Sequence, residues 1–294
     1  MPIHFYIMES SKKVLVTGIT GKQGGAVAQN LLKEDVKIYG LARNPNSKRA
    51  LEWAEKGIKI LQGDLDQPES YVNHLEGMDA IFCIQAFEQG KESEINQGKK
   101  LIDAIKNQGV KHTIYSSVLG ADLNTGVPHF ESKMVLEDYL ISKDLPYTIL
   151  RPASFYENYL NPEITKRLQK GKLVMPLNKS VRQQVIGIDD IGKIAAKVIT
   201  NPSNYRNKTL SIATDDKTME EVAQSFENAM NRPIKYQKLP GFLTRLLMGK
   251  DLSKMFKYMN RNDFVVVKDI EAIKQEFDGL SNLDQWIHDH FSNS

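Results

Sequence analysis

The stretch Val14–Gly25, VLVTGITGKQGG, passes from an apolar run into three glycines spaced three apart, and a helix-like segment at residues 26–32 follows it. Glycine allows positive φ in a tight turn, and its missing side chain lets the backbone approach a pyrophosphate. The helix that follows points free N–H groups at the same anion. We therefore interpret the stretch as a dinucleotide-binding turn. Its candidate cofactor-binding residues are Gly18, Thr20, Gly21, Lys22, Gln23 and Gly24.

The context decides this interpretation, because a glycine triplet alone also fits an ordinary strand-turn-helix. Apolar, β-branched runs alternate with segments of helical period along the first half of the chain. The expected strands are Val36–Leu41, Ile58–Gln62, Ala80–Ile84, His112–Ser116 and Tyr147–Leu150. This alternation predicts an α/β fold with a doubly wound parallel sheet, whose ligands bind at the carboxyl ends of the strands.

The second half is expected to be mixed. Three strands are predicted, at Lys172–Met175, Gln183–Ile186 and Thr209–Ile212, together with a short helix near residues 164–170. A second helix is predicted from an N-cap at Asp189 to about Thr200. A third, at 218–230, opens with a capping box from Thr218 to Glu221. We expect a main α/β domain at residues 12–155 plus 184–214. A smaller substrate domain then covers 156–183 plus 215–294, and residues 1–11 form an N-terminal extension.

Methionine and aromatic residues are frequent near the C-terminus, where we expect short helices over a pocket. These residues are Phe242, Met248, Met255, Phe256, Tyr258 and Met259. Two interpretations stay open, namely packing in the core and a pliable substrate lid.

Composition narrows the class of protein. The chain has 294 residues, 41% of them hydrophobic and 26% charged, and its formal net charge is +3. We expect no direct nucleic-acid binding and no membrane partner from so small a net charge, so any site for a polyanion must be local. No zinc-type ligand spacing is evident, and no stretch is long enough to span a bilayer. The single cysteine, Cys83, lies in an apolar run and fits a small core residue in a cytoplasmic protein.

The residues after the second strand indicate which dinucleotide binds. NAD-binding turns usually carry an acidic residue about twenty positions beyond the glycines. This chain instead has Arg43, followed by Ser47-Lys48-Arg49. A guanidinium pairs with a 2′-phosphate, which a carboxylate would repel, so we expect NADP with Arg43 as its ligand. The alternative is a solvated turn and helix start.

Two later strand ends offer further contacts. Asp64 and Leu65 follow the third strand, where they can accept from the adenine amino group and pack against its ring. Capping of the following segment is an equal alternative for Asp64. Gln85 and Ala86 follow the fourth strand, where the phosphate or ribose would pass.

These motifs, in this order and spacing, resemble the NmrA-like family of atypical short-chain dehydrogenase/reductases. The resemblance covers most of the chain. It rests on the glycine turn, Ala42–Pro45, Gly63–Leu65, Tyr115–Ser117, His129–Lys133, Leu150–Pro152, Phe155–Asn158 and Ile188–Gly192. It implies an NADP-preferring Rossmann domain and a smaller C-terminal part that forms a cleft.

The resemblance also exposes a departure. Ordinary superfamily members place a tyrosine four residues before a lysine, as proton donor and ribose ligand respectively. Here Lys133 is in place, but the position four before it is His129. We expect Lys133 and Ser116 to hold the nicotinamide ribose, with Ser117 beside them, and His129 is the first candidate for the donor. The alternatives are an exposed helix lysine for Lys133 and a helix-start residue on the cleft rim for His129.

Tyr115 and Tyr156 are alternative donors, although tyrosines often only pack in apolar pockets. Phe155 is expected beside the cofactor. The segment from Phe155 to Asn158 is also expected to contact the substrate, whose identity has no readable code.

The absent tyrosine limits the reaction. Reduction of an ordinary ketone leaves a strongly basic alkoxide that needs an acid, whereas a quinone-like acceptor leaves a phenolate whose conjugate acid has a pKa of about 10. The sequence therefore favours an NADPH-dependent reductase of electron-poor small molecules. The alternative that the resemblance implies is a regulator that senses NADP(H) and acts through a protein partner without turnover.

Overall fold

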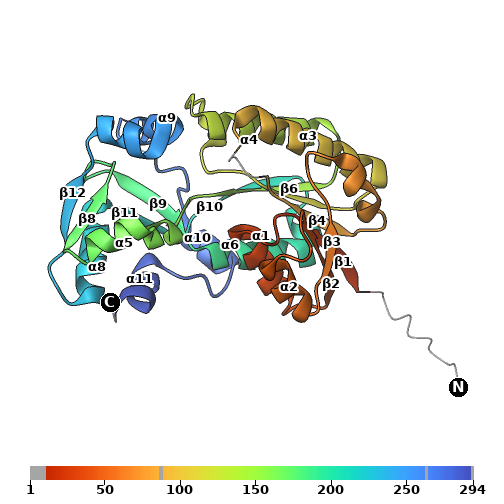
Figure 1. Ribbon diagram of the computed structural model, residues 1–294, viewed down its shortest axis with the longest axis horizontal. Helices are drawn as coiled ribbons and strands as arrows, with labels where there is room; N and C mark the ends of the chain where they lie inside the picture. Colours follow the sequence, from red (N-terminus) through yellow and green to blue (C-terminus); the bar gives the residue numbers. More distant parts are fainter. Residues whose placement is uncertain (1–10, 86–88, 262–263, 293–294) are drawn as a thin grey trace, which may run out of the picture.

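The computed structural model describes residues 11–85, 89–261 and 264–292. Its larger part is built on a seven-stranded sheet in the order β10-β6-β5-β4-β1-β2-β3, with every neighbouring pair parallel (Figure 1). The strands are β1 (Lys12–Val16), β2 (Val36–Ala42), β3 (Lys59–Gln62), β4 (Ala80–Cys83), β5 (Thr113–Ser116), β6 (Tyr147–Pro152) and β10 (Lys208–Ile212). The strand order reverses between β1 and β4, which confirms the predicted doubly wound sheet.

Helices cover both faces of this sheet, with α3 and α4 on one face and α1 and α6 on the other (Figure 1). These helices and the neighbouring α2 are α1 (Lys22–Leu31), α2 (Lys48–Glu55), α3 (Lys91–Gln108), α4 (Pro128–Ser142) and α6 (Ile188–Thr200). Two glycines let the helices cross closely. A Cβ at Gly98 would lie 2.5 Å from Leu136 on α4, and one at Gly192 would lie 2.5 Å from the carbonyl oxygen of Ala26 on α1.

The smaller part holds a three-stranded sheet, β11-β9-β7, and a two-stranded sheet, β12-β8. Its elements, with the neighbouring short helix α7, are β7 (Ser154–Phe155), β8 (Lys172–Met175), β9 (Arg182–Ile186), β11 (Asp215–Thr218), β12 (Lys235–Lys238), α5 (Pro162–Leu168), α7 (Pro202–Tyr205), α8 (Met219–Met230), α9 (Gly241–Met259), α10 (Ile270–Glu276) and α11 (Leu283–Phe291). Short 3-10 turns at Pro68–Ser70, Val72–Leu75, Ala121–Leu123 and Tyr156–Leu160 complete the described elements. A mixed C-terminal part is thus confirmed, while the domain boundaries stay a prediction.

Two helix starts test the capping predictions. The capping box of α8 is confirmed, because the Thr218 hydroxyl accepts from the N–H of Glu221 while the Glu221 carboxylate accepts from the N–H of Thr218. The predicted N-cap at Asp189 is wrong, since Gly187 holds that position and α6 already begins at Ile188. The Asp189 carboxylate instead accepts from a side-chain amide of α1, so it ties two helices together.

Most of the core is one hydrophobic cluster that runs from β1 into the smaller part, where aromatic rings meet. Tyr159 lies edge-on to Phe226, which in turn lies edge-on to Phe291. Cys83 is buried and unpaired, as predicted. The expected N-terminal extension lies outside the described residues except for Ser11. Across the described ranges, no helix combines the length and apolar character that a membrane crossing requires.

Candidate functional site

The glycine turn follows β1 and closes on its own backbone. Gly18 has φ +61°, and its carbonyl oxygen accepts from the N–H of Gly21 at 2.8 Å. A Cβ at Gly24 would lie 2.3 Å from the same carbonyl oxygen and 2.7 Å from that of Thr17. Backbone therefore occupies the space that a side chain would need, and the turn presents a bare surface to a ligand.

The start of α1 supplies the anion site that this turn predicts. Gly21 is its N-cap residue and offers no side-chain cap, and the first turn carries no acidic residue. The first N–H groups of the ten-residue helix are thus left for a ligand or water. Lys22 is exposed beside them. This cradle fits a pyrophosphate.

Cations lie next to the turn. Arg43 is exposed after β2, and no ion pair joins it to a carboxylate in the described parts of the chain. Arg49, on α2, donates to the carbonyl oxygen of Thr20 at 2.8 Å and so fixes the α2 start against the turn. This arrangement leaves Arg43 available to a phosphate.

The residues after β3 and β4 have different surroundings. One carboxylate oxygen of Asp64 accepts from the N–H of Asp66 at 3.1 Å, which closes a local turn. The 3-10 turn that follows has Gln67 at its N-cap, so Asp64 does not cap it. Leu65 is half-buried.

Gln85 is buried, and its side-chain carbonyl oxygen has no hydrogen-bond partner. A buried acceptor without a donor is costly, so the Gln85 amide fits a ligand that donates here. Ala86 lies outside the described residues.

The end of β5 meets the start of α1. The Ser116 hydroxyl donates to the side-chain oxygen of Gln23 at 2.7 Å. Two residues predicted to contact the cofactor are therefore in contact with each other, although 93 positions separate them. The neighbouring Ser117 hydroxyl donates instead to the buried carboxylate of Glu137, which pairs with Arg151 at 2.6 Å.

Lys133 lies beside Ser116, as expected. Its ammonium is 3.2 Å from the Ser116 carbonyl oxygen and lies over the Tyr115 ring, 5.3 Å from the centroid. It also forms an ion pair at 2.9 Å with Glu94 of α3, whose side chain is fully buried. Ser132 donates to the other oxygen of that carboxylate. Lys133, the expected ribose ligand, is thus held in place by the buried Glu94 carboxylate.

The sequence analysis did not identify Glu94, although the sequence contains a signal for it. Glu94 shares the spacing of Gly98, Leu101 and Ile105, which form the buried face of α3. A carboxylate at a core position needs a cation or hydrogen bonds, so this pattern predicts a buried partner.

His129 lies in the first turn of α4, and its Nδ1 is 2.6 Å from a carboxylate oxygen of Asp251 on α9. The two side chains are 20% and 25% exposed. Asp251 was also missed, because 122 positions separate it from His129. An Asp that accepts at Nδ1 orients the imidazole, as in hydrolase triads.

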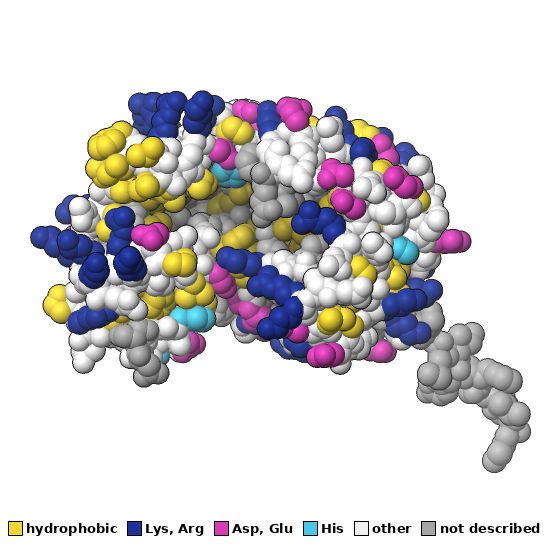
Figure 2. All heavy atoms as spheres, viewed as in Figure 1, with side chains coloured by type: hydrophobic (Ala, Val, Ile, Leu, Met, Phe, Trp, Pro, Cys, Tyr) yellow, Lys and Arg dark blue, Asp and Glu magenta, His cyan; other side chains and the backbone are white. Residues whose placement is uncertain are grey.

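The larger of two adjoining cavities has a volume of about 940 Å³. It reaches from Lys22 and Gly25 on α1 to Met248, Leu252 and Met255 on α9, and Figure 2 shows the hollowed face. Phe155 borders both cavities, in keeping with its expected place beside a ligand.

The smaller cavity, of about 250 Å³, lies between the end of β5 and helix α9. It is bordered by Ser117, His129 and Phe155, and it shares Leu252 and Met255 with the larger cavity. The methionines at positions 248 and 255 therefore line a pocket, which is the lid interpretation, while Phe256 and Met259 are also buried in the core.

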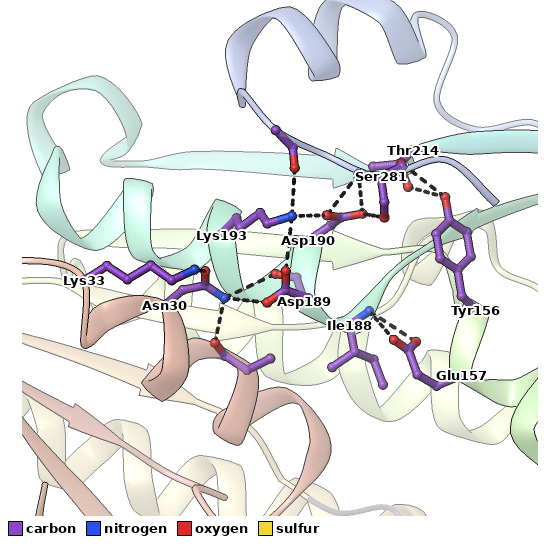
Figure 3. A network of polar contacts seen from close by, with 12 residues as sticks. Asn30, Lys33, Tyr156, Glu157, Ile188, Asp189, Asp190, Lys193, Thr214 and Ser281 are labelled. Atoms are coloured by element: carbon purple, nitrogen blue, oxygen red, sulfur yellow. Dashed lines mark hydrogen bonds and ion pairs between the residues drawn. The ribbon is translucent and has the colours of Figure 1, made fainter. Parts of the chain in front are cut away.

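The alternative donors Tyr156 and Tyr115 are not brought to the cavities. Tyr156 is fully buried, and its hydroxyl is 2.7 Å from that of Thr214, in the network of Figure 3. Burial raises the pKa of both phenols well above the ordinary value. This geometry argues against either tyrosine as the proton donor and identifies Tyr156 as a packing residue.

Figure 3 shows a polar network around α6, whose residues Ile188 and Asp189 border the larger cavity. Asn30 of α1 donates to Asp189 at 2.9 Å, and Lys193 pairs with Asp190 at 3.0 Å. The Glu157 carboxylate accepts from the N–H of Ile188 at 3.0 Å and so caps the start of α6. The Asn30–Asp189 contact ties α6 to α1.

Comparisons with known proteins agree with this geometry. The model of the NmrA-like family matches residues 10–287. An NmrA-like family domain-containing protein of Dictyostelium discoideum is 27% identical over 297 residues, covering 94% of this chain and 97% of the relative. Quinone oxidoreductase 2 of Escherichia coli (strain K12) is 28% identical over 232 residues, covering 77% of each.

Among solved structures, the Citrobacter sp. triphenylmethane reductase complexed with NADP(H) superposes with a TM-score of 0.83 at 20% identity, over 95% of this chain and 99% of that chain. At such an identity the likeness shows a shared fold. Because the family model spans nearly the whole sequence, this protein belongs to the NmrA-like family.

Proposed function

We propose that this protein is an NADPH-dependent reductase of quinone-like, electron-poor small molecules. The observation that carries the proposal is the cleft that runs from the bare start of α1 to His129 beneath the apolar face of α9. One end of this cleft offers an anion site and the other offers an uncharged wall. That combination suits a dinucleotide whose reactive ring faces an apolar acceptor.

The preference for NADPH rests on charge. The exposed Arg43 follows β2, where an NAD enzyme would carry a carboxylate, and Arg49 holds the adjoining helix against the turn. A guanidinium forms paired hydrogen bonds with a 2′-phosphate. The triphenylmethane reductase that shares this fold was solved with NADP(H), which is consistent with the proposal.

The residues around the reactive ring have separate tasks. The glycine turn and the start of α1 would hold the pyrophosphate, and Lys133 and the unpartnered Gln85 carbonyl oxygen would meet the ribose and the nicotinamide amide. A cofactor bound there would supply a hydride. The apolar side chains of α9 exclude water and pack against the acceptor ring.

One proton must accompany the hydride to give a hydroquinone. His129 borders the smaller cavity and is oriented by Asp251, so it is the candidate donor. A phenolate product has a conjugate acid with a pKa of about 10, and water can also protonate it. The chemistry therefore tolerates the absence of the usual tyrosine when the acceptor is electron-poor. Quinone oxidoreductase 2, a relative by sequence, is named for this class of acceptor.

The test is NADPH oxidation by the full chain with a panel of quinones, enones and cationic dyes, beside titrations of NADPH and NADP. We expect turnover with the quinones and dyes, and His129→Ala to lower kcat about 100-fold while the Kd for NADPH stays the same. Asp251→Asn retains the shape of the side chain and should lower kcat less. Unchanged turnover in His129→Ala would assign the proton to water and leave the reductase standing.

A non-catalytic sensor is the second candidate. The observation that favours it is that both candidate residues already have a carboxylate partner, since Lys133 is ion-paired with Glu94 and His129 Nδ1 is 2.6 Å from Asp251. A sensor must bind oxidised and reduced cofactor with different affinities. No turnover with any acceptor, together with strongly unequal Kd values, would replace the reductase by the sensor.

A further inference from the structure

The first half of α9, residues 241–248, carries the most exposed large hydrophobic side chains among the described residues. Phe242 is 74% exposed, Leu246 is 77% exposed and Leu247 is 62% exposed. The other exposed large hydrophobics of the described chain reach 47% at most, as at Leu51. Side chains of this size rarely gather in the open on a protein that has no partner there.

The lid function does not explain these side chains. Met248, Leu252 and Met255 are the α9 side chains that reach the larger cavity, together with Phe256. Phe242 and Leu246 border neither cavity, so they extend away from the substrate cleft. The helix is broken at Gly249, whose backbone is non-helical at φ +82°. The exposed apolar side chains therefore belong to residues 241–248, and most of the cavity-lining ones belong to the segment after the break.

Positive charge surrounds the exposed face. Residues 235–261 contain seven Lys or Arg and one acidic residue, Asp251, in a chain whose net charge is only +3. Asp251 is itself paired with His129. Five of these seven cations lie between residues 238 and 257; all five are exposed, and none forms an ion pair with a carboxylate of the described chain. They are Lys238, Arg245, Lys250, Lys254 and Lys257.

Figure 2 shows this surface from outside, with hydrophobic side chains gathered over α9 and Lys and Arg side chains along their rim. The helix lies at the end of the molecule away from β2 and β3 (Figure 1). A flat partner can therefore reach it without meeting the larger sheet.

We propose that residues 241–248 dock this protein on the surface of an anionic phospholipid bilayer. Helices that lie in a membrane interface combine large apolar side chains with a Lys/Arg-rich polar rim, and bind through buried apolar area and attraction to acidic headgroups. Phe242, Leu246 and Leu247 enter the boundary between headgroups and acyl chains. The five cations contact the phosphates.

A second copy of the chain fits this surface poorly. A twofold contact applies the same patch to itself, so the cations of one copy would face those of the other. A phospholipid surface instead provides the complementary charge. From the sequence alone, no membrane partner was expected, because the net charge of the whole chain is small. That total hides the concentration of positive charge in residues 235–261.

Docking in this way also places the pocket near the lipid, because the larger cavity is lined by Met248, the last residue of the docking segment, and by Leu252, which follows the break at Gly249. An acceptor dissolved in the bilayer would then have a short path to the cleft. The docking itself does not depend on the proposed function, since it is measured without substrate or cofactor.

The experiment is flotation of the full chain with vesicles of phosphatidylcholine alone, or of phosphatidylcholine mixed equally with phosphatidylglycerol. We expect at least about tenfold more bound protein on the mixed vesicles, and weaker binding at high salt. The variant Phe242→Ser/Leu246→Ser should lose this binding, and Lys250→Glu/Lys254→Glu should lose most of it.

The matched control is Leu51→Ser/Ile141→Ser, which removes two exposed hydrophobics from α2 and α4 and should bind vesicles as the unaltered chain does. All variants are compared by circular dichroism and by their unfolding midpoint, so loss of folding is separated from loss of docking. Absence of vesicle binding by the unaltered chain would overturn the proposal. So would a dimer in solution that Phe242→Ser/Leu246→Ser dissociates while vesicle binding is unchanged. NADPH turnover is measured on the same samples, and its failure would count against the reductase alone.

Discussion

At the glycine turn the structure places backbone against backbone, whereas at His129 it brings together side chains from distant segments. A Cβ at Gly24 would meet the backbone of Gly18 and Thr17, six and seven positions earlier in the chain. His129 depends on Asp251, and Lys133 depends on Glu94, across separations of 122 and 39 positions. The cofactor end is therefore encoded locally and the acceptor end by the tertiary fold.

Because the two regions are built differently, substitutions in them should affect binding and stability differently. A substitution in the turn changes the shape of a surface and leaves most of the core untouched. A substitution in the Lys133–Glu94 pair leaves a buried charge without its partner, which costs stability as well as binding. The comparison is tested by measuring both properties for both regions.

The largest effect is expected for Lys133→Met. The Glu94 carboxylate is fully buried, so removal of its counter-charge should lower the free energy of unfolding by about 3–5 kcal/mol. The double variant Lys133→Met/Glu94→Gln removes both charges and should recover most of that loss. Urea unfolding of the single and double variants measures the coupling between the two side chains.

The single variant Glu94→Gln is the control for this cycle. Lys133 keeps the Ser116 carbonyl oxygen and is 12% exposed, so loss of the Glu94 charge should cost less than loss of the lysine. Equal and additive losses would show that the pair contributes little, and the distinction between the two ends of the cleft would weaken.

The next effect concerns cofactor affinity rather than stability. A Cβ at Gly24 would lie 2.3 Å from a backbone oxygen, so Gly24→Ala must reshape the turn. We expect NADPH to bind about 100-fold more weakly, which corresponds to about 2.8 kcal/mol. Fluorescence titration of NADPH measures the change.

Gly21→Ala serves as the graded control, because its Cβ would lie 3.1 Å from the Gly18 carbonyl oxygen at an ordinary negative φ. Its loss of affinity should be distinctly smaller than that of Gly24→Ala. If the two substitutions weaken NADPH equally, close packing of the turn is not what limits binding.

The same contrast explains how much the sequence could reveal. The strands of the large sheet, the glycine turn and the α8 capping box follow from neighbouring residues, and all three were predicted. The position of Ser116 beside the turn follows from the rule that strand ends meet at one edge of a parallel sheet. Lys133 lies on α4, and its place beside Ser116 was expected from the resemblance to the family.

The partners of the charged site residues did not follow, because they depend on how helices cross. Asp251 reaches His129 only through the packing of α9 over α4, and no spacing within the chain encodes that contact. Asp189 is a second residue whose contact could not be predicted from the sequence. It has the residue type of an N-cap, but its contact with Asn30 of α1 is tertiary.

The smallest effect concerns the preference for NADPH over NADH at the glycine-turn end of the cleft. Arg43 is exposed after β2, so its substitution should leave the core intact. Arg43→Glu puts a carboxylate where the 2′-phosphate is expected, and NADPH should bind about tenfold more weakly while NADH binds as before. Parallel titrations of the two cofactors give the ratio of the two Kd values.

Lys48→Glu is the matched control, since it makes the same change in net charge at an exposed position on the first residue of α2. A general electrostatic effect would weaken NADPH similarly in both variants, whereas direct contact with the phosphate weakens it mainly in Arg43→Glu. Equal losses for NADPH and NADH in Arg43→Glu would remove this residue from the phosphate site. The selectivity would then have to come from another cation near the turn, of which Arg49 is the first to test because it already contacts the Thr20 carbonyl oxygen.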